Sequence, residues 1–298
     1  MKKHFIARAI LALAAAGLIF PQQGQPAQTQ AAPAGGSPVA KQPSVKSQAE
    51  GEALQAIFQT TDANSRIKAA DEFVVKFADS EFKPFVLMVA AETYRQMNNY
   101  ENTVIYGERV LEADPQNYMA MLLLASTIAQ RTREHDLDRE EKLGRVEKYV
   151  KTALDLIEKA PRPRPDVTDD QWNQAKADFK AQAHEAMGMA AIARKNYPAA
   201  ITELKTAIEM SPTPDPATQV RLGAVYNLAG QYDNAIATLN QVMATPDLHP
   251  QIRQIAQAER ARAMQAKGVT AAPQAPAAAP APAAPQAAPA PAAPEPKL

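Results

Sequence analysis

The chain has 298 residues, its 32 Lys and Arg balance its 32 Asp and Glu, and it contains no cysteine. Zero formal net charge gives no overall attraction to nucleic acid or to an anionic membrane surface. The lack of cysteine excludes disulfides, thiolate zinc sites, cysteine nucleophiles and a lipid-modified N-terminal cysteine. The residues are 46% hydrophobic and only 6% aromatic, and their helical periodicity predicts an all-α protein.

Residues 1–27 are predicted to be a secretory signal. An apolar run, residues 9–20, follows three basic residues, Lys2, Lys3 and Arg8. The run is shorter than the about 20 residues that a membrane-spanning helix needs, and its length and basic flank are typical of a bacterial signal peptide. We therefore expect export to the periplasm or the extracellular side, with cleavage near Ala27 or Ala31. The alternative is that the run is retained as a membrane anchor.

Two segments are predicted to be disordered. Residues 28–46 are rich in Pro, Gln, Ala and Ser, and residues 268–298 consist mainly of Ala and Pro. Neither has enough large apolar residues to offset the entropy lost on ordering. The Ala/Pro-rich tail favours polyproline II and, at about 3.1 Å per residue, could extend on the order of 90 Å. We interpret it as a spacer; the alternative is a tether or ligand for a partner or the cell wall.

An internal repeat in residues 181–249 organises the region between these segments, residues 47–267. Gly188 is followed by Gly223 and Ala200 by Ala235, each 35 residues later. A tyrosine (Tyr197, Tyr232) and a closing proline (Pro212, Pro246) recur in the same register. A period of this size is typical of stacked helix-turn-helix units.

Each repeated position has a physical reason. Glycine inside a helix costs about 1 kcal/mol relative to alanine, which is tolerable where the missing side chain lets a second helix approach closely. Proline cannot continue a helix, so each helix pair ends before it. A single pair cannot bury its apolar face alone, and neighbouring pairs must therefore stack.

The two blocks resemble the tetratricopeptide repeat (TPR) family, whose pattern has Leu-Gly, an aromatic, Ala, an aromatic or Leu, and Pro at these offsets. Leu222-Gly223, Tyr226, Ala235 and Pro246 match it, although the family's leading Trp is missing. The resemblance implies a right-handed solenoid of stacked helix-turn-helix repeats.

Five helix pairs and a final helix are expected in residues 47–267. Residues 47–83 form a degenerate pair, and residues 84–117 a clearer one whose turn, Asn99-Tyr100, recurs as Asn196-Tyr197. Gly107 stands where later repeats have Leu204 and Leu239, which predicts weaker packing. The remaining expected units are residues 118–161 with a charged insertion at 131–140, 168–214 and 216–249, and a capping helix at 250–267.

Two local signals refine these units. Thr168, Asp169, Asp170 and Gln171 predict a capping box, with Val167 and Trp172 spaced as a hydrophobic staple. The insertion contains Glu134, His135, Asp136 and Asp138, whose spacing fits neither an EF-hand loop nor a two-histidine zinc helix. We therefore predict a solvated, salt-bridged loop there.

The sequence contains no recognisable catalytic arrangement. Neither a glycine-rich phosphate loop nor a Gly-x-Ser-x-Gly elbow is present. Beyond His4 the histidines, His135, His184 and His249, lie far apart in the chain. We expect no catalytic residue, cofactor or metal.

The resemblance implies instead a concave groove, lined by the first helix of each pair, that binds another protein. Its expected lining is Met88, Glu92, Arg95, Leu122, Ser126, Ala129, Glu185, Met189, Ile192, Val220, Ala224 and Asn227. These residues predict an apolar, partly methionine-lined groove suited to an amphipathic helix or an extended apolar segment. Leu122 and Ile192 could equally belong to the core between repeats.

The resulting hypothesis is a non-catalytic, exported TPR scaffold or adaptor of the bacterial cell envelope. The alternative is a structural spacer or assembly subunit, tethered across an envelope layer by its Ala/Pro-rich segments.

Overall fold

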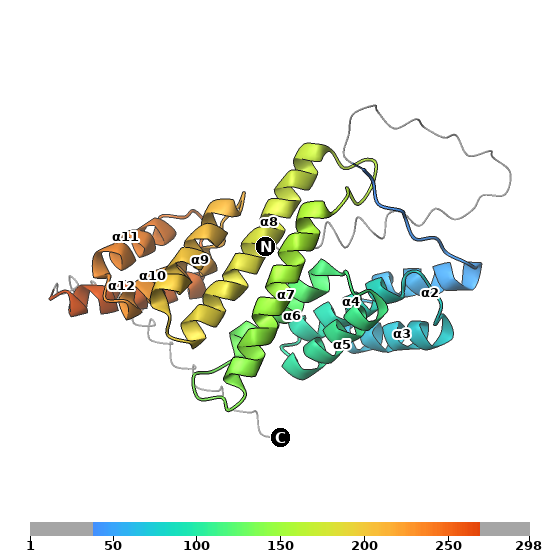
Figure 1. Ribbon diagram of the computed structural model, residues 1–298, viewed down its shortest axis with the longest axis horizontal. Coiled ribbons are helices and arrows are strands. Elements are labelled where there is room, and N and C mark those ends of the chain that lie inside the picture. Colours follow the sequence, from blue (N-terminus) through green and yellow to red (C-terminus); the bar gives the residue numbers. More distant parts are fainter. Residues whose placement is uncertain (1–37, 269–298) are drawn as a thin grey trace, which may run out of the picture.

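The computed structural model describes residues 38–268, which form eleven helices stacked in chain order (Figure 1). They are α2 (Gln48–Gln59), α3 (Ala63–Lys76), α4 (Lys83–Gln96), α5 (Tyr100–Ala113), α6 (Tyr118–Arg131), α7 (Arg139–Lys159), α8 (Asp169–Ala193), α9 (Tyr197–Met210), α10 (Pro216–Leu228), α11 (Tyr232–Met243) and α12 (Pro250–Ala266). Within these residues the only β pairing is an isolated bridge between Val39 and Arg162. The all-α prediction is therefore confirmed.

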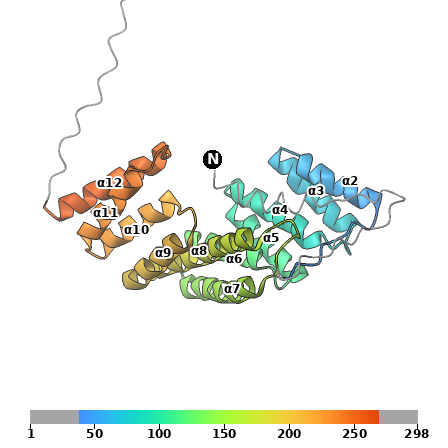
Figure 2. The ribbon, with the colours of Figure 1, turned by 90° about the horizontal axis from the view of Figure 1, so that it is seen from above.

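The helices form a solenoid in which each one packs against its neighbours along the chain. Seen from above, they follow an arch, with α7 on its outer side (Figure 2). First helices also contact each other from pair to pair, as α6 does α8 and α10 does α12. The buried side chains accordingly form several clusters distributed along the stack. Stacking of helix pairs, as predicted, replaces a single core.

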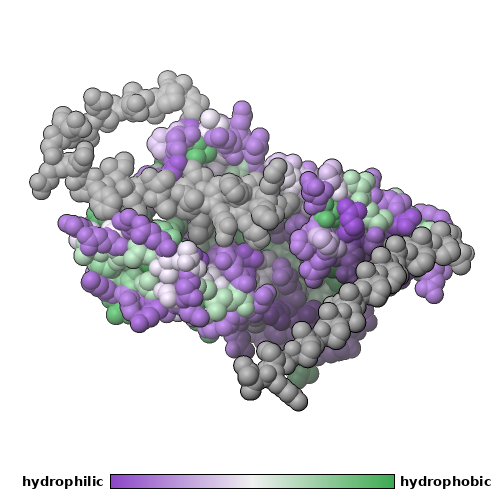
Figure 3. Space-filling view, turned by 180° about the vertical axis from the view of Figure 1, so that it is seen from behind, coloured by the Kyte–Doolittle hydropathy of each residue, from purple (hydrophilic) through white to green (hydrophobic). Residues whose placement is uncertain are grey.

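The exposed surface agrees with this distribution of apolar side chains. The described part of the face seen from behind is mainly hydrophilic, with hydrophobic residues scattered among the polar ones (Figure 3). Single apolar residues on a surface are normal for a folded protein. The large apolar side chains are thus used mainly between helices.

Within a pair, glycine on the first helix faces leucine on the second. A Cβ added at Gly188 would lie 2.8 Å from Cδ2 of Leu204, and one at Gly223 would lie 2.7 Å from Cδ2 of Leu239. Both leucines are completely buried. The predicted close approach of the paired helices is therefore present.

The expectation of weaker packing at Gly107 is wrong. Gly107 lies on the second helix of its pair, α5, and a Cβ there would be 2.8 Å from Cδ2 of Leu124 on the next helix, α6. Leu124 is completely buried. The same small-against-large contact thus forms between pairs at this point, and Leu124 fills the space.

The turns inside three pairs share one backbone conformation. Asn98, Lys195 and Gly230 each have a positive φ, between 57° and 71°. The residue that follows each of them donates its backbone N–H across the turn, as Asn99 does to the Tyr94 carbonyl at 2.9 Å. This is the Schellman geometry that ends a helix. The recurring Asn99-Tyr100 and Asn196-Tyr197 turns thus start the second helices, and the asparagines cap them.

The start of α8 is as predicted. The Thr168 hydroxyl accepts from the Gln171 backbone N–H, and the Gln171 side chain accepts from the Thr168 N–H. Val167 and Trp172 are both buried in one cluster, and the indole N–H of Trp172 donates to the Ala160 carbonyl at 3.1 Å. These contacts fix the connection between α7 and α8.

The charged insertion is shorter than predicted. Arg131 ends α6 and Arg139 begins α7, which leaves residues 132–138 as the loop. Glu140 and Glu141 lie in the first turn of α7, where the helix dipole favours acidic side chains.

The loop is salt-bridged, but mainly to cations outside it. Glu134 pairs with Lys195 at 2.6 Å and Asp136 with Lys142 at 3.1 Å. The hydrogen bond from Lys195 holds the pKa of Glu134 below its usual value. Arg194 binds Glu140 at 2.9 Å, so the insertion is tied to the turn between α8 and α9.

The structure also differs from the prediction that residues 28–46 are disordered throughout. Residues 38–46 are hydrogen-bonded to two loops, and they are held by backbone pairing, by ion pairs and by the packing of Val45 against a buried core cluster. Residues 1–37, with the signal or anchor, and residues 269–298, with the Ala/Pro-rich tail, lie outside the described residues. Within residues 38–268, no helix is long and apolar enough to cross a membrane.

The glycine–leucine contact predicts opposite effects for two glycine substitutions. Gly223→Ala should lower the free energy of unfolding, because overpacking costs about 1–3 kcal/mol and outweighs the gain in helix propensity. Gly144→Ala in α7, where nothing lies within 4 Å of the added Cβ, should raise it by up to about 1 kcal/mol. Urea unfolding followed by circular dichroism measures both; equal stabilisation by the two substitutions would contradict the close contact.

Candidate functional site: a groove along the first helices

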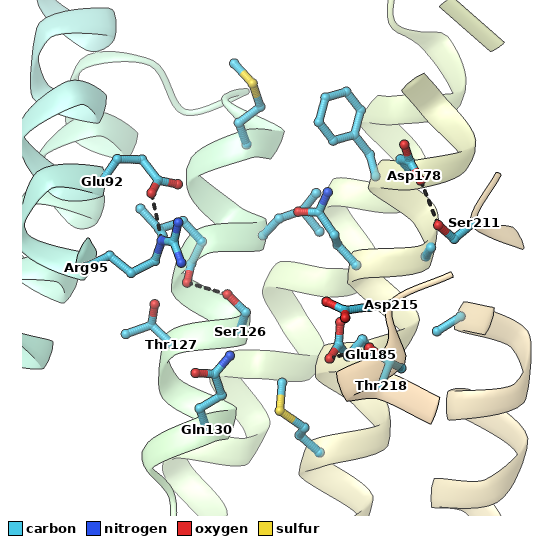
Figure 4. A pocket seen from close by; sticks show the side chains of 18 of the residues that line it. Glu92, Arg95, Ser126, Thr127, Gln130, Asp178, Glu185, Ser211, Asp215 and Thr218 are labelled. Carbon is cyan, nitrogen blue, oxygen red and sulfur yellow. Dashed lines mark hydrogen bonds and ion pairs between the residues drawn. The ribbon is translucent and has the colours of Figure 1, made fainter. Parts of the chain in front are cut away.

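A groove of about 410 Å³ runs across α4, α6 and α8, the first helices of three successive pairs (Figure 4). Its far side is formed by the end of α9, the connection to α10 and Thr218 of α10. None of its lining residues comes from α7, the second helix of the middle pair. The repeat order therefore creates the groove, because it places every other helix on the same face of the stack.

The groove brings together seven of the twelve residues predicted from the sequence: Met88, Glu92, Arg95, Leu122, Ser126, Glu185 and Met189. Five others lie outside it: Ala129, Ile192, Val220, Ala224 and Asn227.

Contacts with other helices explain why three of these five residues lie outside the groove. Val220 belongs to a core cluster with Leu239 and Leu248, and Ile192 packs against another cluster. Asn227 donates its side-chain N–H to the Glu259 carbonyl of α12 at 2.9 Å. On α10, the residues that the repeat pattern predicts for the groove, Val220 and Asn227, therefore pack α10 against α11 and α12.

The lining contains both apolar and polar side chains, Met88, Met119 and Met189 among them, so an apolar, partly methionine-lined groove stays a prediction. Met88 and Met189 contribute to the lining but are only 5% and 7% exposed, because most of each side chain packs between helices. Leu122 is 4% exposed and also belongs to a core cluster. Polar side chains occupy much of the accessible surface, among them Ser126, Gln130 and Gln182.

Charges of opposite sign lie on the two sides of the groove. On α4, Arg95 pairs with Glu92 at 2.7 Å, and Arg131 ends α6. On the other side Asp178, Glu185 and Asp215 contribute acidic side chains (Figure 4). A ligand lying across the groove therefore meets the Arg95–Glu92 ion pair and Arg131 at one side, and mainly carboxylates at the other.

Hydrogen bonds fix the acidic side. The Ser211 hydroxyl donates to Asp178 at 2.9 Å, and the Thr218 hydroxyl donates to Glu185 at 2.9 Å. Arg221 pairs with Glu185 as well. Both hydrogen bonds join α8 to residues 33 positions further along the chain, so this wall is assembled by the tertiary structure.

Thr127 is a buried polar residue of the groove whose hydroxyl has no partner. Its side chain lines the groove, the residue is only 8% exposed, and its hydroxyl makes no hydrogen bond to the described chain. A buried hydroxyl without a partner costs about 1–3 kcal/mol. Because the hydroxyl oxygen is itself buried, a group that enters the groove can bond to it only if the Thr127 side chain turns about χ1.

No metal cluster is found near this groove in the described part of the chain. No group of three or more potential metal ligands occurs in residues 38–268. Nδ1 of His184 lies 2.7 Å from Glu203 in a contact between α8 and α9, and His249 caps α12. His184 and His249 thus make structural contacts. What the groove offers is a surface to which a ligand can bind.

Comparisons with known proteins address the family. Two tetratricopeptide repeat models match the chain, one over residues 86–117 and one over residues 191–267. No curated protein is similar enough to count as a match.

Solved structures provide two further likenesses. A thermophilic TPR protein in Thermus thermophilus is 17% identical, with a TM-score of 0.46, covering 70% of this chain and 98% of the other. The assembly chaperone of RpL4 (Acl4), residues 1–338, is 12% identical with a TM-score of 0.41, covering 74% of this chain and 98% of that one. The matched models, together with the repeat period and the stacked helix pairs, show that the chain contains tetratricopeptide repeats.

Proposed function

We propose that this protein is a non-catalytic, exported adaptor of the bacterial cell envelope that holds a segment of another protein in the groove across α4, α6 and α8. The observation that carries the proposal is this continuous groove, which three successive repeats form together. Tetratricopeptide repeat proteins are scaffolds for protein–protein interaction and generally lack catalytic activity.

The lining favours a peptide segment with both apolar and polar side chains. Met119 and Ile208, both half-buried, supply apolar surface, while Gln130 and Gln182 present amides. Apolar anchors in pockets supply most of the affinity of such contacts, and polar groups around them add specificity. The unpartnered hydroxyl of Thr127 is one such polar group.

Steric obstruction of the groove tests the proposal. Ser126→Arg adds a long side chain to a half-buried groove position, and we expect it to reduce partner recovery at least tenfold by affinity capture, equivalent to about 1.4 kcal/mol or more. Thr152→Arg on α7 is the matched control, because its hydroxyl, like that of Ser126, bonds to a backbone carbonyl of its own helix. Equal recovery of the same partner by both variants would refute groove binding. Charged substitutions of Met88 and Met189 are unsuitable, because both residues are almost buried.

The buried hydroxyl of Thr127 gives a second test. Thr127→Val keeps the shape and removes an unsatisfied hydroxyl, so the free chain should be as stable or more stable by up to about 1 kcal/mol. Partner affinity should fall, because the bound segment loses a hydrogen bond. Thr93→Val is the control: Thr93 is buried, and its hydroxyl donates to the Val89 carbonyl at 2.7 Å. Calorimetric titration with the captured partner measures both variants; unchanged affinity for Thr127→Val would remove Thr127 from the site.

The proposed export rests on the basic start and the apolar run of residues 9–20. When the full chain is produced in a Gram-negative bacterial host, we expect it in the periplasmic fraction, with an intact mass lacking about the first 27 residues, the length of the proposed signal. Deleting residues 2–20 should leave the chain in the cytoplasm. Recovery of the full-length mass from the membrane fraction would instead support an anchor, and full-length chain in the cytoplasm would contradict export.

A further inference from the structure

The segment just before the first helix joins two loops that are far apart in the sequence. The Ala40 N–H donates to the Arg162 carbonyl and the Arg162 N–H donates to the Pro38 carbonyl, both at 2.8 Å. The Gln42 side chain donates to the Pro163 carbonyl, 121 residues away. Residues 38–46, hereafter the strap, are thereby fixed to the connection between α7 and α8 (Figure 1).

The other end of the strap is fixed to the turn between α3 and α4. The Ser44 N–H donates to Glu81 at 3.0 Å, and Lys41 pairs with the same carboxylate at 3.4 Å. These contacts hold the pKa of Glu81 below its usual value, the Ser44 N–H being the main cause. The Lys46 side chain also donates to the Asp79 carbonyl.

Both attachment points are firm. Arg162 is 8% exposed, and its guanidinium donates to the Val167 carbonyl at 3.0 Å and pairs with Asp169 at 3.4 Å. At the α3–α4 turn, Phe82 is buried and its N–H donates to the Ser80 hydroxyl at 3.0 Å. Movement of the strap is therefore coupled to α4, which begins at Lys83, and to α8, whose first residue Asp169 pairs with Arg162.

Those helices are two walls of the groove. Asp79 and Glu81 precede α4, and Arg162 and Pro163 precede α8, whereas α6 lies between the two walls. Four residue steps separate Ala40 from Ser44, so this stretch spans at most about 14 Å when fully extended. The two loops cannot move apart beyond that reach without breaking the contacts.

The geometry points to the strap as a tether that limits the separation of α4 and α8 and so sets the width of the groove. Each repeat interface in a solenoid contributes a small rotation to the curvature. A link from α4 to α8 that bypasses α6 restrains two such interfaces at once. Its effect on partner binding rests on the proposed function, but its effect on the spacing of the helices does not.

Distance measurements between spin labels test the tether on the full chain without a partner. Because the chain contains no cysteine, Gln96→Cys on α4 and Asn173→Cys on α8 give two unique labelling sites, both exposed and outside the groove lining. In the strap-broken chain, Ala40→Pro and Gln42→Ala remove the donors to Arg162 and Pro163, and Glu81→Ala and Lys46→Ala remove the side-chain contacts at the α3–α4 turn. Ala40→Ser with Glu112→Ala is the control, since it keeps these contacts and neutralises an exposed glutamate elsewhere.

We expect one narrow distance distribution for the parent and the control, and a broader one with a longer mean for the strap-broken chain. Inserting Gly-Gly-Ser-Gly between Gln42 and Pro43 keeps every anchor and lengthens only the tether; it should also broaden the distribution. Unchanged distributions in the strap-broken and lengthened chains would overturn the tether. If the distributions change while Ser126→Arg leaves partner recovery intact, the groove proposal fails and the tether stands.

Discussion

The stack depends on the contact between a glycine of one helix and a buried leucine of the next. Gly188 and Gly223 leave space on first helices that Leu204 and Leu239 occupy from the second helices. The helix axes can approach closely only because no Cβ stands between them. Since each repeat contacts mainly its neighbours, the spacing at the interfaces that have this contact contributes to the shape of the array.

The Gly107–Leu124 contact shows that a glycine of one helix can face a leucine of the next helix between repeats as well as within a repeat. Gly107 lies on a second helix, yet its empty side meets a leucine of the following first helix. A solenoid needs close packing both within and between pairs. The repeat formed by α4 and α5 has its glycine, Gly107, at the interface with the next repeat. That next repeat supplies the leucine, Leu124.

Much of this fold is predictable because its signals are local. The 35-residue period, the capping residues around Thr168, and the prolines after α9 and α11 all depend on neighbours in the chain. The groove was only partly predictable. Periodicity reports that Val220 and Asn227 lie on a buried face, but the partner of that face is decided by how α12 folds back onto α10. The Asp178–Ser211 contact joins residues with no shared motif, and Thr127 stands out only once its neighbours are known.

The ordered strap could not be predicted from the sequence for a related reason. Residues 38–46 have the composition of a linker, and composition measures how much apolar surface a segment can bury. Their order comes from backbone pairing with Arg162, from the carboxylate of Glu81 and from the packing of one side chain, Val45, against a core cluster, none of which composition reports. Nearest-neighbour packing lets small changes at successive interfaces add up along a solenoid. A link spanning 121 residues in the chain, from Gln42 to Pro163, opposes that accumulation in the part of the array that contains the groove. The same repeat architecture can thus have a restrained N-terminal half and a C-terminal half whose curvature is set by local packing.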